Sequence, residues 1–358
     1  MTISLNGTTG IQFPDGSLQA AAASPYVLKN RIINGDMQID QRNAGASLTL
    51  TNSVLYTVDR WSGFEDTDGG ATAQQVTDAP TGFNNSLKIT ITSQDSSLGA
   101  AQRLIVQHRI EGYNIADLGF GTANAKTFTL SFWVKSSLTG TFGGGFTNAS
   151  NNRSYAFTYT ISAANTWEQK TITVAGDTTG TWGTTNGVGM TITFGLGVGS
   201  TYSATSGSWV AQDVNSATGA VSVIGTNGAT WYITGVQLEQ NTSATPFERR
   251  LYGQELANCQ RYYIGDGTIY YSQGAVDSAY STEGMFINLP TQMRISPTVV
   301  RYNWNKEGHI SGSNTSNPAN NTVSASPTSL LLRWSSASAG YRAFGYAGSI
   351  TPYLSAEL

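Results

Sequence analysis

The stretch WYITGVQLEQNTSATPFERRLYGQELANCQRYY, residues 231–263, decides how the fold is divided. It begins with the composition of a β-strand and continues into a pattern that matches a helical capping box. In that motif the Thr245 hydroxyl accepts an unpaired backbone N–H, and the Glu248 side chain reaches back to the capping residue. Pro246 fills the first helical position, where no N–H is needed. The stretch therefore predicts the last strand of one domain, a connecting helix over residues 246–263, and then a second domain.

The predicted helix has one face that must be covered. Tyr252, Leu256, Cys259 and Tyr263 follow one another at spacings of four, three and four, which places them on the same side. An isolated helix this short is marginal in water, so this face is expected to pack against something. The chain's own β domains are favoured on general grounds, and a neighbouring copy of the chain is the alternative.

Composition indicates a two-domain β protein without a nucleic-acid partner. The chain has 358 residues, which is enough for two cores, and 40 of them are glycine. Only 11% of the residues are charged, against about 25% in typical globular domains. The net charge is −3 and there is no basic run, so the sequence does not predict nucleic-acid binding.

The same composition argues against membranes and disulfides. The chain has one cysteine, so it has no internal disulfide framework. No apolar run approaches the roughly 20 residues that a membrane span needs. The first residues, MTISLNGTTG, lack the basic and apolar regions of a signal peptide. We expect a protein that is made in a cytoplasm, does not insert into a membrane and leaves the cell, if at all, within a larger particle.

Residues 29–245 carry frequent strand signals and predict a β-sandwich. Glycine, asparagine, aspartate and serine clusters separate the predicted strands, and no helical pattern lies between them. Several strands alternate with period two, such as Phe128, Leu130 and Phe132 on one side of a strand. The predicted strands are residues 55–61, 87–92, 103–110, 128–134, 155–161, 170–174, 189–196 and 231–238.

The two ends of the chain predict smaller units. Residues 1–28 cannot form a core alone; they contain turn chemistry at 13–17 and a potential helical turn at 18–23, and they are expected to dock on a partner or on their own copies. Residues 264–358 predict a second, smaller β unit. Within it, residues 330–334 predict a buried strand and residues 305–326 a long exposed loop.

Six blocks spread over most of the chain are similar to parts of tailed-bacteriophage fibre and receptor-binding proteins. The blocks are TTGIQFPDGSLQAAA (8–22), NRIINGDMQIDQR (30–42), GVQLEQ (235–240), TPFERR (245–250), ELANCQRYY (255–263) and SAEL (355–358). The large domain also resembles the jelly roll of carbohydrate-binding modules, in residues 59–64, 107–111 and 129–137. These are structural signatures, and none of them is catalytic.

The resemblance implies an adhesin subunit of a phage tail, located on the virion. It implies attachment to a tail or baseplate protein through residues 1–28, a jelly-roll body over 29–245 and a distal β-sandwich tip over 264–358. It also implies a homotrimer in which the 246–263 helix is the joint. In that joint Tyr252, Leu256 and Cys259 would meet their symmetry mates. A monomeric carbohydrate-binding module and a head decoration or neck fibre are the alternatives.

Catalytic signals are weak, and the chain is not expected to be an enzyme. His108 and His309 are the only histidines and neither has metal-ligand spacing. We expect His108 to be an exposed or hydrogen-bonded residue on the polar side of its strand. There is no GxSxG motif, and Cys259 is expected to serve packing. Glycan hydrolysis is the enzymatic alternative, and it needs two carboxylates across a cleft. Its candidates are Asp59, Glu65, Glu111, Asp213 and Glu283.

Two short stretches resemble ligand-binding loops without completing them. Residues 121–127, GTANAKT, resemble a phosphate loop, but Ala125 replaces the glycine that must precede the lysine. Residues 66–70, DTDGG, resemble a calcium loop without its closing ligands, so a hairpin turn is expected there. The sequence predicts no cofactor and no metal site. A calcium ion held between jelly-roll strands stays open, because carbohydrate-binding jelly rolls often carry one, but no ligand set can be named.

Binding of a host surface polysaccharide without cleavage fits the sequence best. Sugar rings stack on aromatic side chains, and several weak sites acting together give avidity. Trp182, Tyr202 and Trp209 lie in turn-rich stretches of the large domain, where exposure is expected. The other candidates, Tyr302, Trp304 and His309, flank the predicted loop of the small domain.

Overall fold

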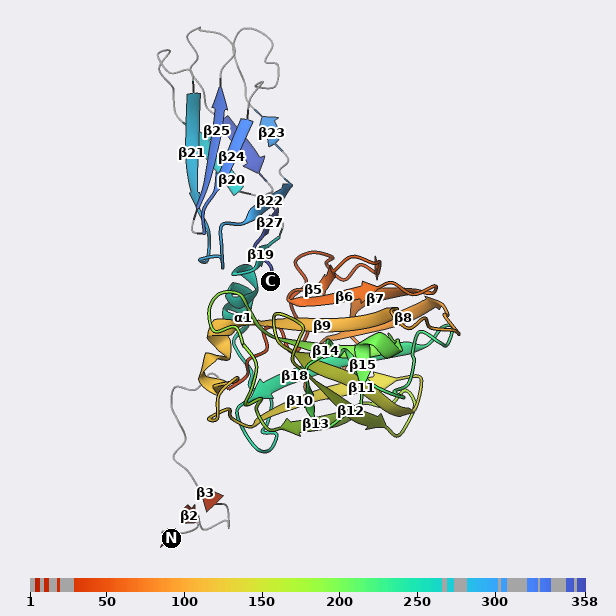
Figure 1. The fold of residues 1–358 in the computed structure, drawn as a ribbon. Helices are drawn as coiled ribbons and strands as arrows, with labels where there is room; N and C mark the ends of the chain where they lie inside the picture. The colour runs from red at the N-terminus through yellow and green to blue at the C-terminus, as the bar shows by residue number, and fades with distance from the viewer. Residues whose placement is uncertain are drawn as a thin grey trace.

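The computed structural model describes residues 29–265 without a break. Outside this range it describes residues 4–6, 10–12, 18–19, 269–273, 282–301, 304–307, 321–327, 329–335, 346–350 and 353–358. The regular secondary structure of this described part is almost wholly antiparallel strand, with one α-helix (Figure 1), which confirms the predicted all-β class. None of its helices is long and apolar enough to cross a membrane.

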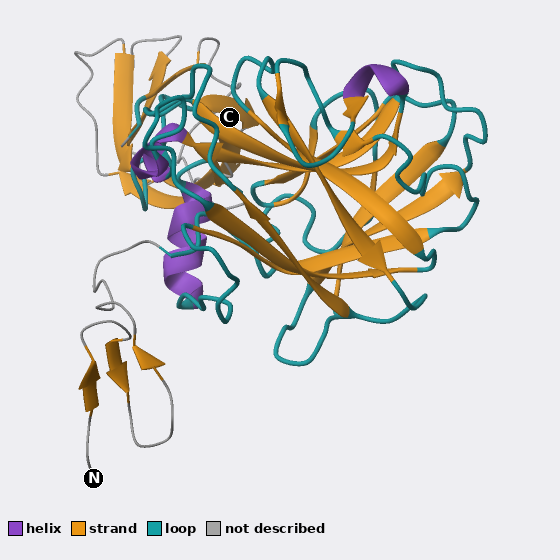
Figure 2. Ribbon diagram, turned by 60° about the horizontal axis from the view of Figure 1, so that its bottom comes forward, coloured by secondary structure: helices purple, strands orange, loops and turns teal. Residues whose placement is uncertain are grey.

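Two sheets packed face to face form the body of the protein (Figure 2). The six-stranded sheet has the order β13 (Glu168–Val174), β10 (Phe128–Ser136), β18 (Thr230–Glu239), β8 (Ser86–Ser93), β7 (Gly70–Val76), β4 (Leu48–Thr49). The seven-stranded sheet has the order β16 (Trp209–Val210), β12 (Ser154–Ile161), β11 (Gly140–Thr147), β14 (Val188–Val198), β9 (Arg103–Glu111), β6 (Trp61–Glu65), β5 (Leu55–Val58). A short parallel pair, β15 (Ser203–Ala204) and β17 (Ser216–Ala217), and three 3-10 turns, Gly112–Asn114, Ala116–Leu118 and Ser200–Tyr202, complete this body.

The chain passes repeatedly from one sheet to the other, which gives a jelly-roll-like sandwich. It crosses between β6 and β7, between β8 and β9, between β9 and β10, and again between β12 and β13. Strands occur at all eight predicted places. One prediction needs a correction, because residues 55–61 form two strands. Asp59 and Arg60 make the turn between β5 and β6, and Arg60 takes a left-handed backbone with φ of 70°.

The core lies between the two sheets and is rich in aromatic rings. Phe194 packs against Phe132 with ring centroids 5.1 Å apart and against Trp231 at 5.6 Å, and all three side chains are fully buried. The predicted inward set Phe128, Leu130 and Phe132 is buried. Each buried large apolar side chain contributes roughly 1.5–3 kcal/mol to stability, so this cluster dominates the packing of the sandwich.

One prediction about a connection is wrong, and two long strands of the sandwich were not predicted. Residues 66–70 do not form a hairpin turn, because they carry the chain from β6 in one sheet to β7 in the other. The glycine-rich stretch GTFGGGFT was not predicted as a strand, yet it is β11, a central strand of its sheet. Residues 70–76 were likewise not predicted and form β7. Glycine lowers strand propensity, and tertiary pairing overrides it here.

The structure also describes small sheets toward both ends of the chain. Near the N-terminus, β1 (Ser4–Asn6), β2 (Gly10–Gln12) and β3 (Leu18–Gln19) pair as antiparallel strands, so the predicted helical turn is wrong at Leu18 and Gln19. The described residues of the C-terminal unit form three sheets of three strands. They are β19 (Tyr263–Ile264), β27 (Tyr353–Ser355) and β22 (Thr298–Arg301); β20 (Ile269–Gln273), β26 (Tyr346–Ile350) and β23 (Trp304–Glu307); β21 (Thr282–Asn288), β25 (Ser329–Ser335) and β24 (Asn321–Ala325).

Two C-terminal predictions have different outcomes. The stretch 330–334 lies in β25, as the predicted strand requires. The predicted loop 305–326 is wrong at both ends, since residues 304–307 belong to β23 and residues 321–325 pair with β25 as β24. Backbone pairing with neighbouring strands thus overrides the loop-like composition of both segments.

The connecting helix is shorter than predicted. Helix α1 runs over Tyr252–Gln260, its N-cap is Leu251, and no side chain caps it. The predicted capping box does not form. The Thr245 hydroxyl donates instead to Glu239 over 2.7 Å, and Glu248 accepts the Asn30 N–H over 2.9 Å. Partners brought by the tertiary fold therefore displace the local cap that the motif predicts.

The helix packs on its own chain. Cys259 is fully buried with Ile33, Ile39 and Tyr262, and Leu256 lies against the same cluster. The expected contact of Cys259 with symmetry mates is therefore wrong, and burial raises the pKa of its thiol well above the ordinary value. Tyr263, expected on the same helical face, lies in β19 and is also buried.

Tyr252 is the exception among the residues predicted for the trimer contact. It lies at the start of α1 and is 59% exposed, beside Leu251 at 81%. Two of the three predicted side chains, Leu256 and Cys259, thus pack within the chain, while the third faces outward.

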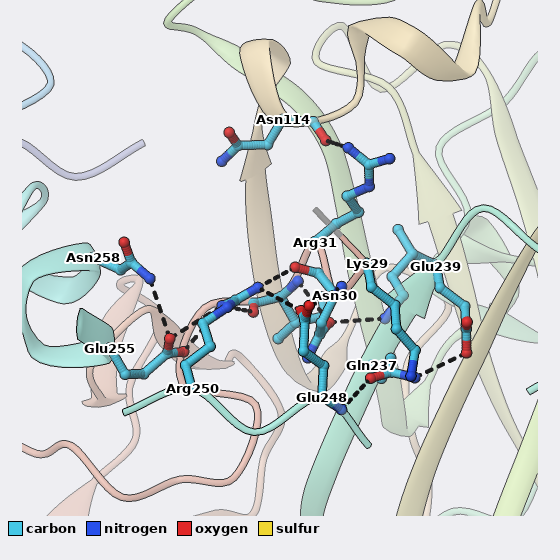
Figure 3. Close-up of polar contacts among 12 residues, drawn as sticks. Lys29, Asn30, Arg31, Asn114, Gln237, Glu239, Glu248, Arg250, Glu255 and Asn258 are labelled. Atoms are coloured by element: carbon cyan, nitrogen blue, oxygen red, sulfur yellow. Dashed lines mark hydrogen bonds and ion pairs between the residues drawn. The ribbon is translucent and has the colours of Figure 1, made fainter. Parts of the chain in front are cut away.

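A polar network surrounds the start of the helix (Figure 3). Arg250 lies at its centre, with its guanidinium donating to the backbone carbonyls of Asn30 and Ile32 and pairing with Glu255 at 3.1 Å. Glu248 accepts the Asn30 N–H from the other side. The Arg250 side chain is only 10% exposed, so these groups have little access to water and depend on one another.

We predict that Arg250→Ala destabilises the fold strongly. The change leaves the Glu255 carboxylate and two buried carbonyl groups without their cation, and breaking a buried ion pair in this way costs about 3–5 kcal/mol. Urea unfolding measures the loss. Lys29→Ala is the control, because Lys29 makes its hydrogen bond to Pro246 at an exposed site, and we expect a change within about 0.5 kcal/mol. Equal stability of the two variants would contradict the central place of Arg250.

Candidate functional site

Strand β9 presents two different faces. Leu104, Val106 and Ile110 are buried in the core. Because side chains alternate along a strand, the residues that alternate with them, including Arg103, Ile105 and Gln107, point to the outer face of the seven-stranded sheet. The polar outward positions mark a strand whose second face is not part of the core.

These outward side chains form the floor of a groove of about 260 Å³, here called the β9 groove. Register places Thr193 of β14 beside Gln107, and Thr191 beside Arg109. On the other side, Phe64 of β6 lies beside Ile105. The lining residues are Val54, Phe64, Arg103, Ile105, Gln107, Arg109, Thr147, Ala149, Asn151, Val188, Thr191, Thr193, Asp213 and Asn215.

One wall of the groove is a segment that crosses the outer face of β11. A Cβ atom on Gly145 would lie 2.4 Å from the Val214 carbonyl oxygen, and one on Gly143 would lie 2.3 Å from the Ser216 hydroxyl. Only glycine allows the segment to lie this close. The glycines of β11 thereby place Asp213 and Asn215 at the edge of the groove.

Several polar groups in the groove lack protein partners. Among the described residues, no hydrogen-bond partner faces the Gln107 amide or the hydroxyls of Thr191 and Thr193, although Gln107 and Thr193 are only 7% and 1% exposed. Polar groups in such positions gain from a ligand that supplies hydroxyl groups or other donors and acceptors. The lining of the groove therefore suits a polar ligand.

Arg103 stiffens one end of the groove. Its guanidinium lies 4.0 Å from the ring centre of Tyr202 and 5.1 Å from that of Phe64, and it donates to Asn215 over 2.6 Å. The Asp213 carboxylate lies 3.6 Å from the same guanidinium. Burial raises the pKa of Asp213, and the charge of Arg103 opposes that rise.

His108 differs from its prediction. It faces the core in phase with Val106, is 1% exposed and packs edge-on against Trp61 at 5.0 Å. Its Nε2 atom lies 3.1 Å from the Ile33 carbonyl oxygen. Burial, together with the charge of Arg60, lowers its pKa well below the usual value. The expected hydrogen bond is present, but the expected position on the polar side is wrong.

None of the three aromatic contacts predicted in the large domain lines the groove. Trp182 is 7% exposed and packs edge-on against Phe120 and Trp209, so its expected exposure is wrong. Trp209 is half-buried, and its indole N–H donates to the Ala175 carbonyl oxygen over 2.8 Å. Only Tyr202 comes near the groove, through the Arg103 guanidinium that lies over its ring.

The predicted contacts in the small domain are only partly described. Trp304 begins β23, opposite Ile350 of β26. Tyr302 and His309 lie outside the described residues. Their predicted role in receptor binding stays a prediction.

The predicted carboxylates do not form a pair across the groove. Asp213 is the one that lines it. Asp59 is buried at the β5–β6 turn, Glu65 accepts from Thr67, and Glu111 holds Arg261 through two hydrogen bonds. Glu283 lies in β21. Residues 121–127 form a turn and a short loop, residues 66–70 connect the two sheets, and no group of three metal-ligating side chains occurs among the described residues.

The sequence contained a signal for this site that the predictions did not use. The strand prediction for residues 103–110 was right, and its alternation separates Gln107 and Arg109 from the apolar positions. The neighbours on β14 and on the crossing segment depend on register and on a chain crossing. Neither can be derived from local pattern.

No protein-family model matches the chain, and no curated protein matches it. Among solved structures, the chain is similar to the enzymatically active domain of tailspike protein 4 of bacteriophage CBA120, with 14% identity and a TM-score of 0.32 over 61% of this chain and 22% of that one. A family 11 carbohydrate-binding module from Clostridium thermocellum matches with 10% identity and a TM-score of 0.29, over 53% of this chain and 96% of that one. A putative sugar binding protein from Bacteroides thetaiotaomicron VPI-5482 matches with 11% identity and a TM-score of 0.34, over 60% and 100%. Values this low identify neither a family nor an activity.

We predict a pH dependence of stability that comes from Asp59. Burial raises its pKa from 3.8 to about 6, against the opposing hydrogen bonds from Gln41. The folded chain therefore binds this proton more tightly than the unfolded chain. The resulting stabilisation is complete below about pH 4 and is lost as the pH rises through about 6, by about 3 kcal/mol in total.

Asp59→Asn removes this dependence. The free energy of unfolding of the unsubstituted protein, measured relative to the variant, should fall between about pH 4 and pH 7. Asp68→Asn is the control, because Asp68 is exposed and its carboxylate makes no ion pair among the described residues. Parallel pH profiles for the unsubstituted protein and Asp59→Asn would show that this carboxyl group titrates normally.

Proposed function

We propose that the chain is an adhesin subunit that binds a carbohydrate in the β9 groove. The observation that carries this proposal is the set of polar side chains on the groove floor, Gln107, Thr191 and Thr193, that have no hydrogen-bond partner among the described residues. Sugar hydroxyls are both donors and acceptors, so one ring can satisfy several such groups. Phe64 offers an apolar surface at the end of the floor for a sugar C–H face.

The size of the groove suits a short segment of a glycan. Its volume of about 260 Å³ lies just below the roughly 300–1,000 Å³ of pockets that take drug-sized ligands. A single site of this kind binds weakly. Several copies acting together on a dense cell surface would supply the avidity that attachment requires.

We further propose that the groove binds and does not cleave. Glycoside hydrolysis normally uses two carboxyl groups on either side of the bond. Among the groove's lining residues Asp213 is the one carboxyl group, and it pairs with Arg103. Released reducing ends after incubation with a bound polysaccharide would overturn this part of the proposal.

The proposed place of the chain is the tail of a phage, as a homotrimeric tail fibre or receptor-binding protein attached through residues 1–28. The support is the sequence resemblance in blocks 8–22, 30–42, 235–240, 245–250, 255–263 and 355–358. Polysaccharide on the host surface is the proposed receptor. A monomeric carbohydrate-binding module and a head decoration fibre would use the same groove, and they differ in oligomeric state or in attachment point.

We predict that Gln107→Leu and Thr191→Val weaken binding to surface polysaccharide about fivefold each, since each removes one hydrogen bond of about 1 kcal/mol at nearly constant volume. Thr160→Val is the matched control, because it is an exposed residue of the same sheet outside the groove. Isothermal titration with polysaccharide from a susceptible host measures the affinities. If the double variant binds as well as the control, the groove is not the site.

We predict a native mass near three times the 38.0 kDa of one chain. Sedimentation equilibrium measures it. A mass near 38.0 kDa would remove avidity within one particle and favour the monomeric carbohydrate-binding module.

A further inference from the structure

The outer face of the six-stranded sheet carries a second set of side chains that the β9 groove does not use. Register aligns Lys135 of β10, Tyr232 of β18 and Lys88 of β8 in one row across three neighbouring strands. Their neighbours along each strand, Val134 and Ile233, point into the core. The row therefore lies on the outside of the sandwich, on the side opposite to the groove.

The centre of this row is an aromatic surface bordered by cations. The Lys135 ammonium lies 4.3 Å from the ring centre of Tyr232 and 5.2 Å from that of Trp167. The two rings meet edge to face at 6.1 Å. The Lys88 ammonium lies 5.6 Å from the Tyr232 ring on the other side. Both rings are half-buried, so part of each remains accessible.

Aromatic side chains continue along β18 toward its bulge. Gly235 has a left-handed backbone with φ of 60°, and a Cβ atom there would lie 2.6 Å from the Phe83 ring and 3.0 Å from the Trp133 ring. Phe83 and Trp133 thus pack over the bulge, and Arg249 lies 4.7 Å from the Phe83 ring centre. We call the surface formed by Lys88, Lys135, Trp133, Trp167, Tyr232, Phe83 and Arg249 the aromatic–cation face.

The charges of this face are not balanced. Lys135 pairs with Asp78, which also accepts the Trp167 indole N–H over 3.2 Å. Lys88 has no carboxylate partner among the described residues. Arg249 donates to the Gly82 carbonyl oxygen and likewise has no carboxylate partner there. Two cations at the two ends of an aromatic stripe therefore remain available for an anionic ligand.

We propose that the aromatic–cation face is a second carbohydrate-binding surface, selective for an acidic polysaccharide. Sugar rings would stack on Tyr232 and Trp167, and carboxylate groups along the chain would pair with Lys88 and Arg249. Tyr232 and the bulge at Gly235 are three residues apart on one strand, which is ~10 Å. This separation favours an extended chain over a single small anion. The surface does not require the β9 groove to bind anything.

The experiment uses the full chain and two forms of one polymer, polygalacturonate and its methyl ester. Binding is measured by affinity electrophoresis or titration at low and high salt. We expect binding to polygalacturonate, weaker binding at high salt, and little binding to the neutral ester, because screening and esterification both remove the charge attraction.

Lys88→Gln should weaken binding to polygalacturonate roughly tenfold, as expected for loss of one charge-assisted contact. Lys126→Gln is the matched control, since it removes one positive charge at an exposed turn elsewhere. Tyr232→Thr should abolish binding and keep a strand-forming residue, with folding checked by thermal unfolding. If Tyr232→Thr fails to fold, Trp167→Ser tests the stacking surface in its place.

Gln107→Leu in the β9 groove should leave polygalacturonate binding unchanged, which separates the two sites.

Three results would overturn the proposal. They are no binding of the unsubstituted chain to polygalacturonate, equal binding of the methyl ester, and equal effects of Lys88→Gln and Lys126→Gln. A change of native mass in Lys88→Gln would show that the face is a contact between copies of the chain and not a carbohydrate surface.

Discussion

The buried carboxylate of Glu255 is the constraint on which the joint between the sandwich and the helix depends. A charged group in this position needs a cation and hydrogen-bond donors, and it receives them from Arg250, from the Asn34 N–H and from the Asn258 amide. The Asn34 side chain donates in turn to the carbonyl oxygens of Ile39 and Asp59. One polar chain of contacts therefore links the start of the domain, the β5–β6 turn and helix α1.

The end of the chain returns to the same place. Glu357 pairs with Arg42 and Arg60, and Arg294 donates to the carbonyl oxygens of Ala356 and Glu357. The similar blocks come from three separate parts of the chain, and they meet here. The blocks are 30–42, then 235–240, 245–250 and 255–263, and then 355–358. Asn30 and Leu238 bond each other, as do Gln237 and Glu248. These five of the six blocks therefore contribute to one structural joint.

The local sequence pattern predicted the strands well, because in each strand apolar side chains that enter the core alternate with side chains that point outward. It failed where a distant partner decided the outcome. Thr245 and Glu248 have the chemistry of a helix cap, but Glu239 and Asn30 are better placed to bond them. The glycines of β11 disfavour a strand locally, yet the crossing segment at Val214 requires them. The floor of the groove depends on the register between β9 and β14, and its wall is the segment at Val214 that crosses β11. The floor was therefore predictable in part from the alternation of β9, and the wall was not.

Both proposed surfaces arise from the geometry of a sandwich. Each strand gives every second side chain to the core, and the remaining positions are free of packing constraints. In β9 those positions carry polar groups that a crossing segment encloses, whereas in β10 and β18 they carry aromatic rings and cations on an open sheet. The two outer faces of a sandwich point away from each other. A single copy of the chain that bound a glycan on each face would therefore bridge two polymer strands, and in that arrangement binding at one face raises the local concentration of ligand at the other.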